Sequence, residues 1–394
     1  MKTRTTRYTI AVALVTCLAA MTAQASVWTG GSGNWSSNGD PGWNGTGVPN
    51  AVGAVASFTT SGTASLDLNV TIGTYSYSAG SNSTRSIGLG SNVLTFDQDG
   101  AGAGYATFSN TATRAGDRLS IGSGSVVLAD DLLLTNTGAC TGSYSIGISS
   151  TISGAGNLTI YNVSNSVTAG PVSLSGTNTF TGSVLLQKGS LILSNAASLS
   201  YGALGSFSNV VTLGSAGNGS VTAVWTGTLA TQGNSYVIAS GTGGTTLFGS
   251  TSTGASDTNF TGTFTMNGDL SVTSAKPSGN LVQFSNVLSG VGALTKVGTG
   301  VVVLSAANTY TGNTTVSEGT LNLASTGELR FKIQNANASN QLLGGSTVNL
   351  DGLFRLDVSA LTDTTGTWNL VNVGTLTETL GGTFNLAFVG GPTF

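Results

Sequence analysis

The chain has 394 residues, of which 59 are glycine, 7% are charged and none is histidine, and its formal net charge is −3. An apolar share of 39% is too high for a disordered chain. The acidic balance offers no electrostatic footprint for DNA or RNA, so nucleic acid is not an expected partner. The lack of histidine excludes Ser–His–Asp and Cys–His catalytic systems and the zinc sites that contain histidine.

The first 25 residues have the pattern of a secretory signal peptide. A basic start (Lys2–Arg7) precedes an apolar run (Ile10–Met21), and Ala23–Ala25 supplies a small–x–small cleavage site. The run is shorter than the roughly 20 residues that span a bilayer. Residues 1–25 therefore predict export, and the rest is not expected to be an integral membrane protein. Removing them would take the net charge to −6 and leave one thiol, Cys140, which can form no internal disulfide.

Residues 26–125 are predicted to form an N-terminal cap and the first β coils. Three of the five tryptophans, Trp28, Trp35 and Trp43, lie near the start of this stretch. The open end of a stack of strands exposes strand edges and a cut core, so a covering segment is expected there. The three tryptophans are predicted to cap the core, and stacking on sugar rings is the alternative.

Carboxylates are the main candidates for chemistry. Asp97 and Asp99, followed by Gly100, resemble a fragment of a calcium-binding loop but lack the further oxygen ligands and the glutamate of a complete loop. Asp130 and Asp131 are neighbours, and neighbours on a strand point to opposite faces, which predicts a bend or a strand end. A glycosidase needs two carboxylates about 5–10 Å apart in a groove. Both pairs are predicted to be turn or surface groups.

Two further groups of side chains have simple structural interpretations. Arg114, Asp117 and Arg118 cluster in a charge-poor chain and predict a surface ion pair. Cys140 has neither a histidine nor a second thiol beside it, and it is predicted to be a small half-buried side chain. We therefore assign no catalytic, cofactor-binding or metal residue.

Residues 126–323 contain internal repeats. Residues 172–193 and 302–323 align without a gap, with 10 of 22 positions identical, and matching pieces extend the best repeats to 152–193 and 288–323. A degenerate third copy covers residues 259–272. Apolar residues alternate with a period of two, and glycines stand where the chain must reverse, which indicates β-strands.

These strands predict an all-β fold. No segment after residue 25 shows apolar residues at helical spacing with a helix cap. Short strands in repeats predict a right-handed parallel β-helix or similar solenoid, with an irregular β-sandwich array as the alternative. Coils of roughly 20–25 residues would make a rod on the order of 80 Å long, with ladders of stacked asparagine and threonine along it.

The second repeat resembles the autotransporter-associated β-strand repeat. Its three parts follow the family patterns G-x-G-x-L-x-K-x-G-x-G, L-S-G-x-N-T-Y-T-G and T-x-V-x-x-G-x-L, and they lie in Leu288–Gly300, Leu304–Gly312 and Thr315–Leu323. Residues 324–394 resemble the closing module of the family and are expected to be truncated. The resemblance implies an exported passenger on the outer surface of a Gram-negative-type cell. Neither a membrane barrel nor a sorting helix is evident after residue 330, which leaves the anchor open.

The sequence therefore predicts an exported cell-surface protein with a structural or adhesive role and no catalytic site. The alternative is a secreted β-helix protein that degrades or binds polysaccharide. The expected partners are surface polysaccharide or other components of the cell envelope, and no cofactor is expected.

Overall fold

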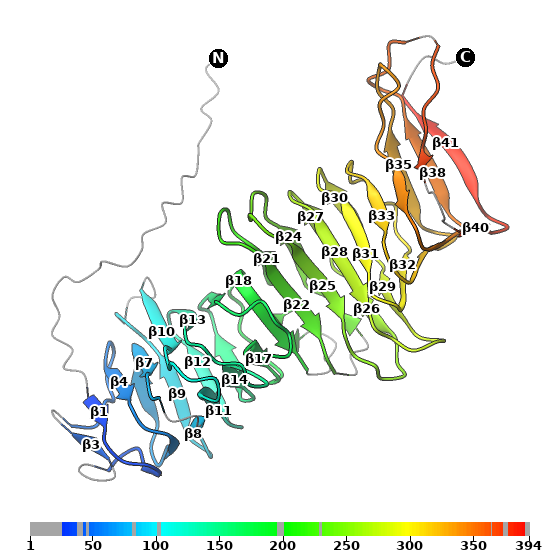
Figure 1. The fold of residues 1–394 in the computed structure, drawn as a ribbon. Coiled ribbons are helices and arrows are strands. Elements are labelled where there is room, and N and C mark those ends of the chain that lie inside the picture. The colour runs from blue at the N-terminus through cyan, green and yellow to red at the C-terminus, as the bar shows by residue number, and fades with distance from the viewer. Residues whose placement is uncertain are drawn as a thin grey trace, which may run out of the picture.

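The computed structural model describes residues 26–37, 42–44, 47–80, 84–100, 104–194, 201–227, 231–363, 365–372 and 377–390. These residues form short strands joined by turns and contain no helix, which confirms the predicted all-β class. They accordingly include no helix that could cross a membrane. The strands stack from one end of an elongated body to the other (Figure 1). The predicted signal peptide, residues 1–25, lies outside the described residues.

The chain winds as a parallel β-helix with three faces. Successive strands pass through face A, face B and a third face, and the chain then returns to face A one level further along. Among the described residues, only β1–β3 and β19–β20 pair antiparallel. This arrangement confirms the predicted solenoid and excludes the β-sandwich array. The right hand of the helix stays a prediction.

Face A begins at the N-terminal end and ends where the second repeat starts. Its strands are β1 (Ser26–Trp28), β3 (Trp43–Asn44), β4 (Val55–Phe58), β7 (Thr74–Tyr77), β10 (Tyr105–Asn110), β13 (Asp131–Asn136), β16 (Leu158–Asn162), the first part of β18 (Val184–Leu193), β21 (Val210–Leu213), β24 (Ser235–Ile238), β27 (Phe264–Met266) and β30 (Leu288–Gly290).

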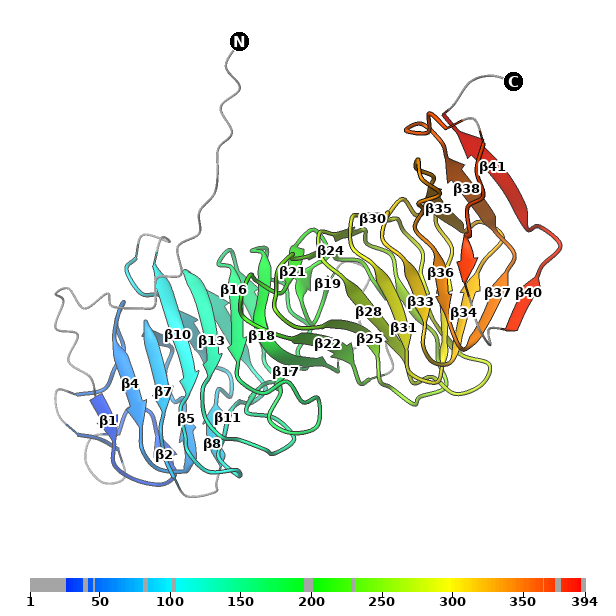
Figure 2. The same ribbon diagram turned by 45° about the horizontal axis from the view of Figure 1, so that its top comes forward.

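Face B runs almost the whole length of the rod, and Figure 2 shows several of its later strands side by side. Its strands are β2 (Gly33–Asn34), β5 (Gly62–Ser65), β8 (Thr84–Gly88), β11 (Arg118–Ile121), β14 (Ile146–Ile148), β17 (Val172–Leu174), the second part of β18, β22 (Val221–Trp225), β25 (Thr246–Ser250), β28 (Leu270–Ser274), β31 (Leu294–Val297), β33 (Thr314–Val316), β36 (Leu342–Gly344) and β39 (Val371–Asn372).

The third face is divided into two sheets with a small hairpin between them. The first sheet holds β6 (Val70–Ile72), β9 (Val93–Phe96), β12 (Ser125–Leu128) and β15 (Thr151–Gly154). The hairpin is β19 (Tyr201–Gly202) with β20 (Gly205–Ser206). The second sheet holds β23 (Thr231–Gln232), β26 (Thr258–Phe260), β29 (Leu281–Phe284), β32 (Val301–Leu304), β34 (Thr320–Leu323), β37 (Thr347–Leu350) and β40 (Thr377–Leu380).

A separate three-stranded sheet forms the C-terminal end. It consists of β35 (Glu328–Lys332), β38 (Leu353–Asp357) and β41 (Asn385–Val389), and it carries the ion pairs Arg330–Asp357 and Arg355–Glu328. In Figure 1 these strands turn away from the line of the preceding coils. On β41, the last strand, Phe388 is 70% exposed, so this end of the apolar interior is open among the described residues.

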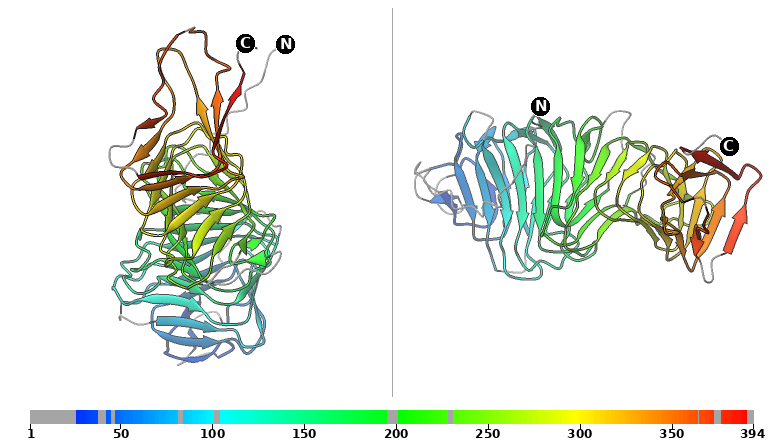
Figure 3. Two further views of the ribbon diagram at one scale, coloured as in Figure 1. Left: turned by 90° about the vertical axis from the view of Figure 1, so that its right-hand side faces the viewer. Right: turned by 90° about the horizontal axis from the view of Figure 1, so that it is seen from above.

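The coils are longer than predicted. From β10 to β30 on face A, paired positions are 24 to 28 residues apart, so the predicted length of 20–25 is too short. Face B runs through thirteen successive parallel pairings. At about 4.8 Å each, these give a rod about 60 Å long rather than 80 Å. Figure 3 shows this long axis from above.

The tryptophan cap is confirmed. Trp28, Trp35 and Trp43 are at most 1% exposed and contact one another and Phe58. Each indole N–H donates to a backbone carbonyl, at 2.7–3.1 Å. The Arg85 guanidinium is also buried there, 4.1 Å from the Phe58 ring centroid. Since the three indoles are enclosed in protein, stacking of these rings on sugars is excluded.

The predicted polar ladder is present inside the helix. Asn110, Asn136 and Asn162 occupy successive positions on face A and are fully buried. The Asn136 Nδ2 donates to the Asn162 Oδ1 at 2.8 Å, and the Asn162 Nδ2 donates to backbone carbonyls of neighbouring residues. These bonds satisfy amide groups that would otherwise destabilise an apolar interior.

Candidate functional site

The repeat motif places one buried asparagine at the same position in both copies. The Asn178 Oδ1 accepts the backbone N–H of Ile152 at 2.9 Å, and the Asn308 Oδ1 accepts that of Leu288 at the same distance. Each asparagine also donates from Nδ2 to the following coil, at Ala203 O (2.7 Å) or Glu328 O (3.1 Å). One side chain thus joins the coil before it to the coil after it.

The residues that follow each asparagine lie directly against the preceding coil. Backbone N–H groups of Thr179 and Thr181 donate to Ile152 O and Gly154 O, and those of Thr309 and Thr311 make the equivalent bonds to Leu288 O and Gly290 O. The glycine that closes each motif is packed on backbone. A Cβ at Gly182 or Gly312 would lie 2.2 or 2.3 Å from a carbonyl oxygen of the preceding coil.

The motif also marks the place where a sheet is interrupted. In the first copy it follows β15, the last strand of the first sheet on the third face, and in the second it follows β30, the last strand of face A. The second copy is therefore turned by one face relative to the first. The degenerate copy differs, because Thr258 is buried where the motif has asparagine, and β26 continues its sheet without a break.

Lys296 is a buried cation within the second repeat. Its side-chain Nζ donates to three backbone carbonyls, those of Val297, Gly298 and Glu318, at 2.5–3.0 Å. Burial lowers the pKa of Lys296 to about 8, and the charge of Glu318 partly opposes this shift. The first copy has Ile160 at this position, so the lysine closes a turn in one copy only.

The carboxylates regroup relative to the sequence pairs. Asp130 lies in a bend, is 1% exposed and accepts the backbone N–H groups of Gln98 (2.6 Å) and Asp99 (3.2 Å) through Oδ2. One carboxylate oxygen each of Asp97, Asp99 and Asp130 lies within 4.8 Å of the other two. Asp131, at the start of β13, instead accepts the Asn157 N–H at 2.8 Å. The prediction that Asp130 and Asp131 point apart at a strand end is confirmed.

A shallow hollow lies on the outside of face B. Serines of neighbouring coils, including Ser120 and Ser173, line it together with Tyr144. The Tyr144 ring covers Gly147, where a Cβ would lie 3.0 Å from the ring, and the Arg118 guanidinium lies 5.6 Å from the ring centroid. None of the residues that line the hollow is a carboxylate. Sequence analysis missed Tyr144 because its turn carries no motif.

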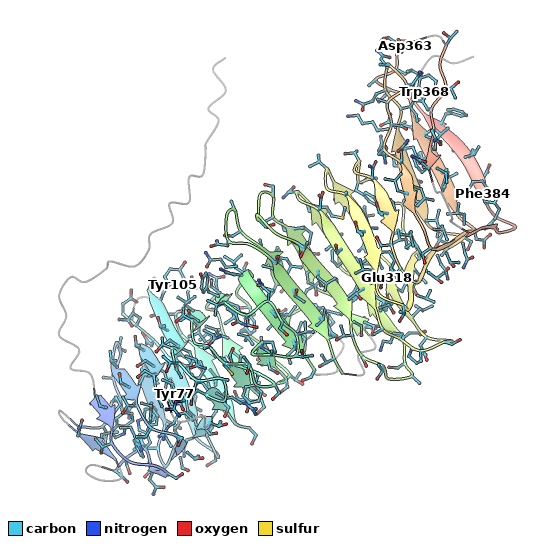
Figure 4. All side chains as sticks on the ribbon, viewed as in Figure 1. Tyr77, Tyr105, Glu318, Asp363, Trp368 and Phe384 are labelled. Carbon is cyan, nitrogen blue, oxygen red and sulfur yellow. The ribbon has the colours of Figure 1, made fainter. Side chains whose placement is uncertain are left out.

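Two predicted surface groups are more deeply placed than expected. Asp117 is fully buried, which contradicts a surface ion pair, and its Oδ2 accepts the Arg114 backbone N–H at 3.2 Å. Cys140 is 4% exposed, not half-buried, and its thiol donates to Tyr144 O at 3.2 Å. Burial raises the pKa of Cys140, which disfavours a reactive thiolate. Exposed groups include Tyr105, which Figure 4 labels at the start of β10.

Residues 169–193 and 294–323 match the family described as passenger-associated-transport-repeat. The chain thus carries two copies of an autotransporter passenger repeat, which confirms the resemblance found in the sequence. Residues 259–272 lie outside both matches, in agreement with their unbroken sheet. No curated protein and no solved structure matches the chain.

Proposed function

We propose that this chain, with its two passenger-associated-transport-repeats, is the exported passenger of an autotransporter-type surface protein. It acts as a structural or adhesive stalk on the outside of a Gram-negative-type cell and has no catalytic site. The observation that carries this proposal is the use of the motif itself. Asn178, Asn308 and the glycines that follow them make contacts between coils, so the repeated residues serve the rod rather than a ligand.

The geometry of the carboxylates supports a role without catalysis. A glycosidase needs an acid and a base on either side of a groove. Asp130 is buried beneath a turn, Asp131 is tied to Asn157, and no carboxylate lines the hollow on face B. We expect no turnover of pectin, alginate, xylan or chitin by the purified chain. Turnover that Asp130→Asn or Asp131→Asn abolishes would contradict this part of the proposal.

Polysaccharide binding is a second candidate function, favoured by the hollow on face B. Serine hydroxyls there can bind sugar hydroxyls, and the Tyr144 ring offers a partly exposed apolar surface. Tyr144→Ala should weaken binding to an envelope polysaccharide at least tenfold in a pull-down titration. Tyr105→Ala, an exposed tyrosine outside the hollow, is the control and should bind like the wild type. Equal binding by all three proteins would remove this candidate.

Export is tested separately. The full chain with an internal epitope tag is produced in a Gram-negative host, and the exported fraction is sequenced from its N-terminus. We expect the mature chain to begin at Ser26, after the predicted signal peptide. A chain that stays in the cytoplasm with residues 1–25 intact would contradict the proposed route.

A further inference from the structure

We propose that Asp97, Asp99 and Asp130 form a site for a divalent cation, with Ca²⁺ as the preferred ion, between two successive coils. The site lies where β9 and β12 end on the third face. Because Phe96 pairs with Leu128, the turn after β9 stands directly over the bend that contains Asp130. A cation there would join the two coils through their side chains as well as through their backbones.

The position of one oxygen atom points to a ligand. The Asp130 side chain is 1% exposed and directed at the turn, because its Oδ2 accepts the N–H groups of Gln98 and Asp99. The other oxygen, Oδ1, is buried and has no hydrogen-bond partner. A buried carboxylate oxygen without a donor is strongly unfavourable, and a bound cation would supply the missing partner.

The local charge supports the same conclusion. Three carboxylates with oxygens within 4.8 Å of one another repel each other when all are ionised. The ion pairs Arg330–Asp357 and Arg355–Glu328 lie at the C-terminal end and do not neutralise this group. A divalent cation would neutralise most of the charge and convert the repulsion into attraction between the coils.

The ligand types favour Ca²⁺ over other metals. All three side chains offer carboxylate oxygens, and the described residues around them contribute neither histidine nor thiolate. Ca²⁺ accepts six to eight oxygens in a flexible arrangement, so water can complete the set, whereas Mg²⁺ demands a near-ideal octahedron. The few protein ligands predict a dissociation constant of about 10⁻⁴ to 10⁻³ M, the range of extracellular calcium modules.

The test is the melting temperature of the full chain, first stripped with EDTA and then measured with CaCl₂ or MgCl₂ at 10 mM. We expect Ca²⁺ to raise the melting temperature of the wild type by about 2–4 °C and Mg²⁺ to raise it less. Asp130→Asn, which still accepts the two backbone N–H groups, and Asp99→Asn should each abolish the rise. Asp131→Asn removes a neighbouring carboxylate outside the site and should keep it.

Two results would overturn the inference. One is a wild-type chain whose melting temperature does not respond to Ca²⁺, together with no heat in a calorimetric titration of CaCl₂. The other is a Ca²⁺ response that survives in Asp99→Asn. Asp99 is exposed, so this variant is expected to fold even if Asp130→Asn does not, and it decides the question alone.

Discussion

The two copies of the repeat keep their contacts to the backbone and exchange the side chains that fill the space between. Asn178 and Asn308 accept equivalent N–H groups at equal distances, although the first copy interrupts the third face and the second interrupts face A. The motif is therefore not tied to one face of the helix. It provides the contacts that hold a coil in place where a strand is missing from the sheet.

The side chains around these contacts differ as matched sets. Tyr310 shares a hydrogen bond with Thr314 at 2.5 Å, while the first copy has the apolar pair Phe180 and Val184 at the same positions. At the turn, the Glu318 carboxylate accepts the Gly298 N–H, whereas Lys188 of the first copy lies near the Tyr161 ring. This agrees with the prediction that the turn needs no fixed charge. Substitutions at these positions can separate what the motif requires from what it tolerates.

The largest effect is expected at the glycines of the strand beneath each motif. Gly154 and Gly290 have φ values of +105° and +109°, and a Cβ would lie 2.2 or 2.3 Å from a backbone carbonyl oxygen. Gly154→Ala and Gly290→Ala should each lower the unfolding free energy by about 3–5 kcal/mol in urea denaturation. Gly217→Ala is the control, because its φ is +75° with no atom near the added Cβ, and it should cost about 1 kcal/mol. Equal costs at all three would contradict close coil contact.

The asparagines come next. Asn178→Ala and Asn308→Ala each leave a buried N–H and buried carbonyls without partners, which should cost about 2–3 kcal/mol in the same assay. Thr258→Ala, at the corresponding position of the degenerate copy, should cost less because β26 already has strand partners on both sides. A reversed order would mean that the asparagine is not the element that replaces the strand.

The lysine that distinguishes the second copy predicts a pH dependence. The pKa of Lys296 is about 8 in the folded chain, against an ordinary value of 10.5. Between these values the unfolded chain binds more protons, so the unfolding free energy should rise by about 1–2 kcal/mol as the pH increases from 8 to 10.5. Lys296→Ile, which reproduces Ile160 of the first copy, should remove this rise. The difference between the two proteins across that pH range is the quantity to measure.

The smallest effect is expected from the aromatic pair. Tyr310→Phe leaves the Thr314 hydroxyl without its partner inside the core and should cost about 1 kcal/mol. Adding Thr314→Val reproduces the Phe180–Val184 pair of the first copy and should recover most of that loss. A double-mutant cycle by urea denaturation gives the coupling. Additive losses would show that the two copies do not exchange these residues as a set.

The sequence predicted the strands, the repeats and the cap because each rests on a local signal. Alternating apolar residues fix which side of a strand is buried, and three tryptophans near one end require a large apolar surroundings. The faces could not be predicted, because they depend on the lengths of the loops. Residues paired between β9 and β12 are 32 positions apart, whereas those between β13 and β16 are 26 apart.

The same loop lengths hid the carboxylate group. In the sequence, Asp130 pairs with its neighbour Asp131, and only the 32-residue coil brings it to Asp97 and Asp99 instead. Tyr144 was missed for a related reason, since it covers Gly147 from a turn without any repeat signal. Local patterns thus predict which residues are buried, while contacts between coils require the coil lengths.

Hydrogen exchange at single amides tests most directly whether the motif holds successive coils together. The N–H groups of Ile152 and Leu288 bond to the side chains of Asn178 and Asn308, and both should be protected in the wild type. Asn178→Ala should increase exchange at Ile152 and leave Leu288 protected, while Asn308→Ala should do the reverse. Unchanged protection at Ile152 in Asn178→Ala, or equal loss at both amides in either variant, would contradict this account of the repeat.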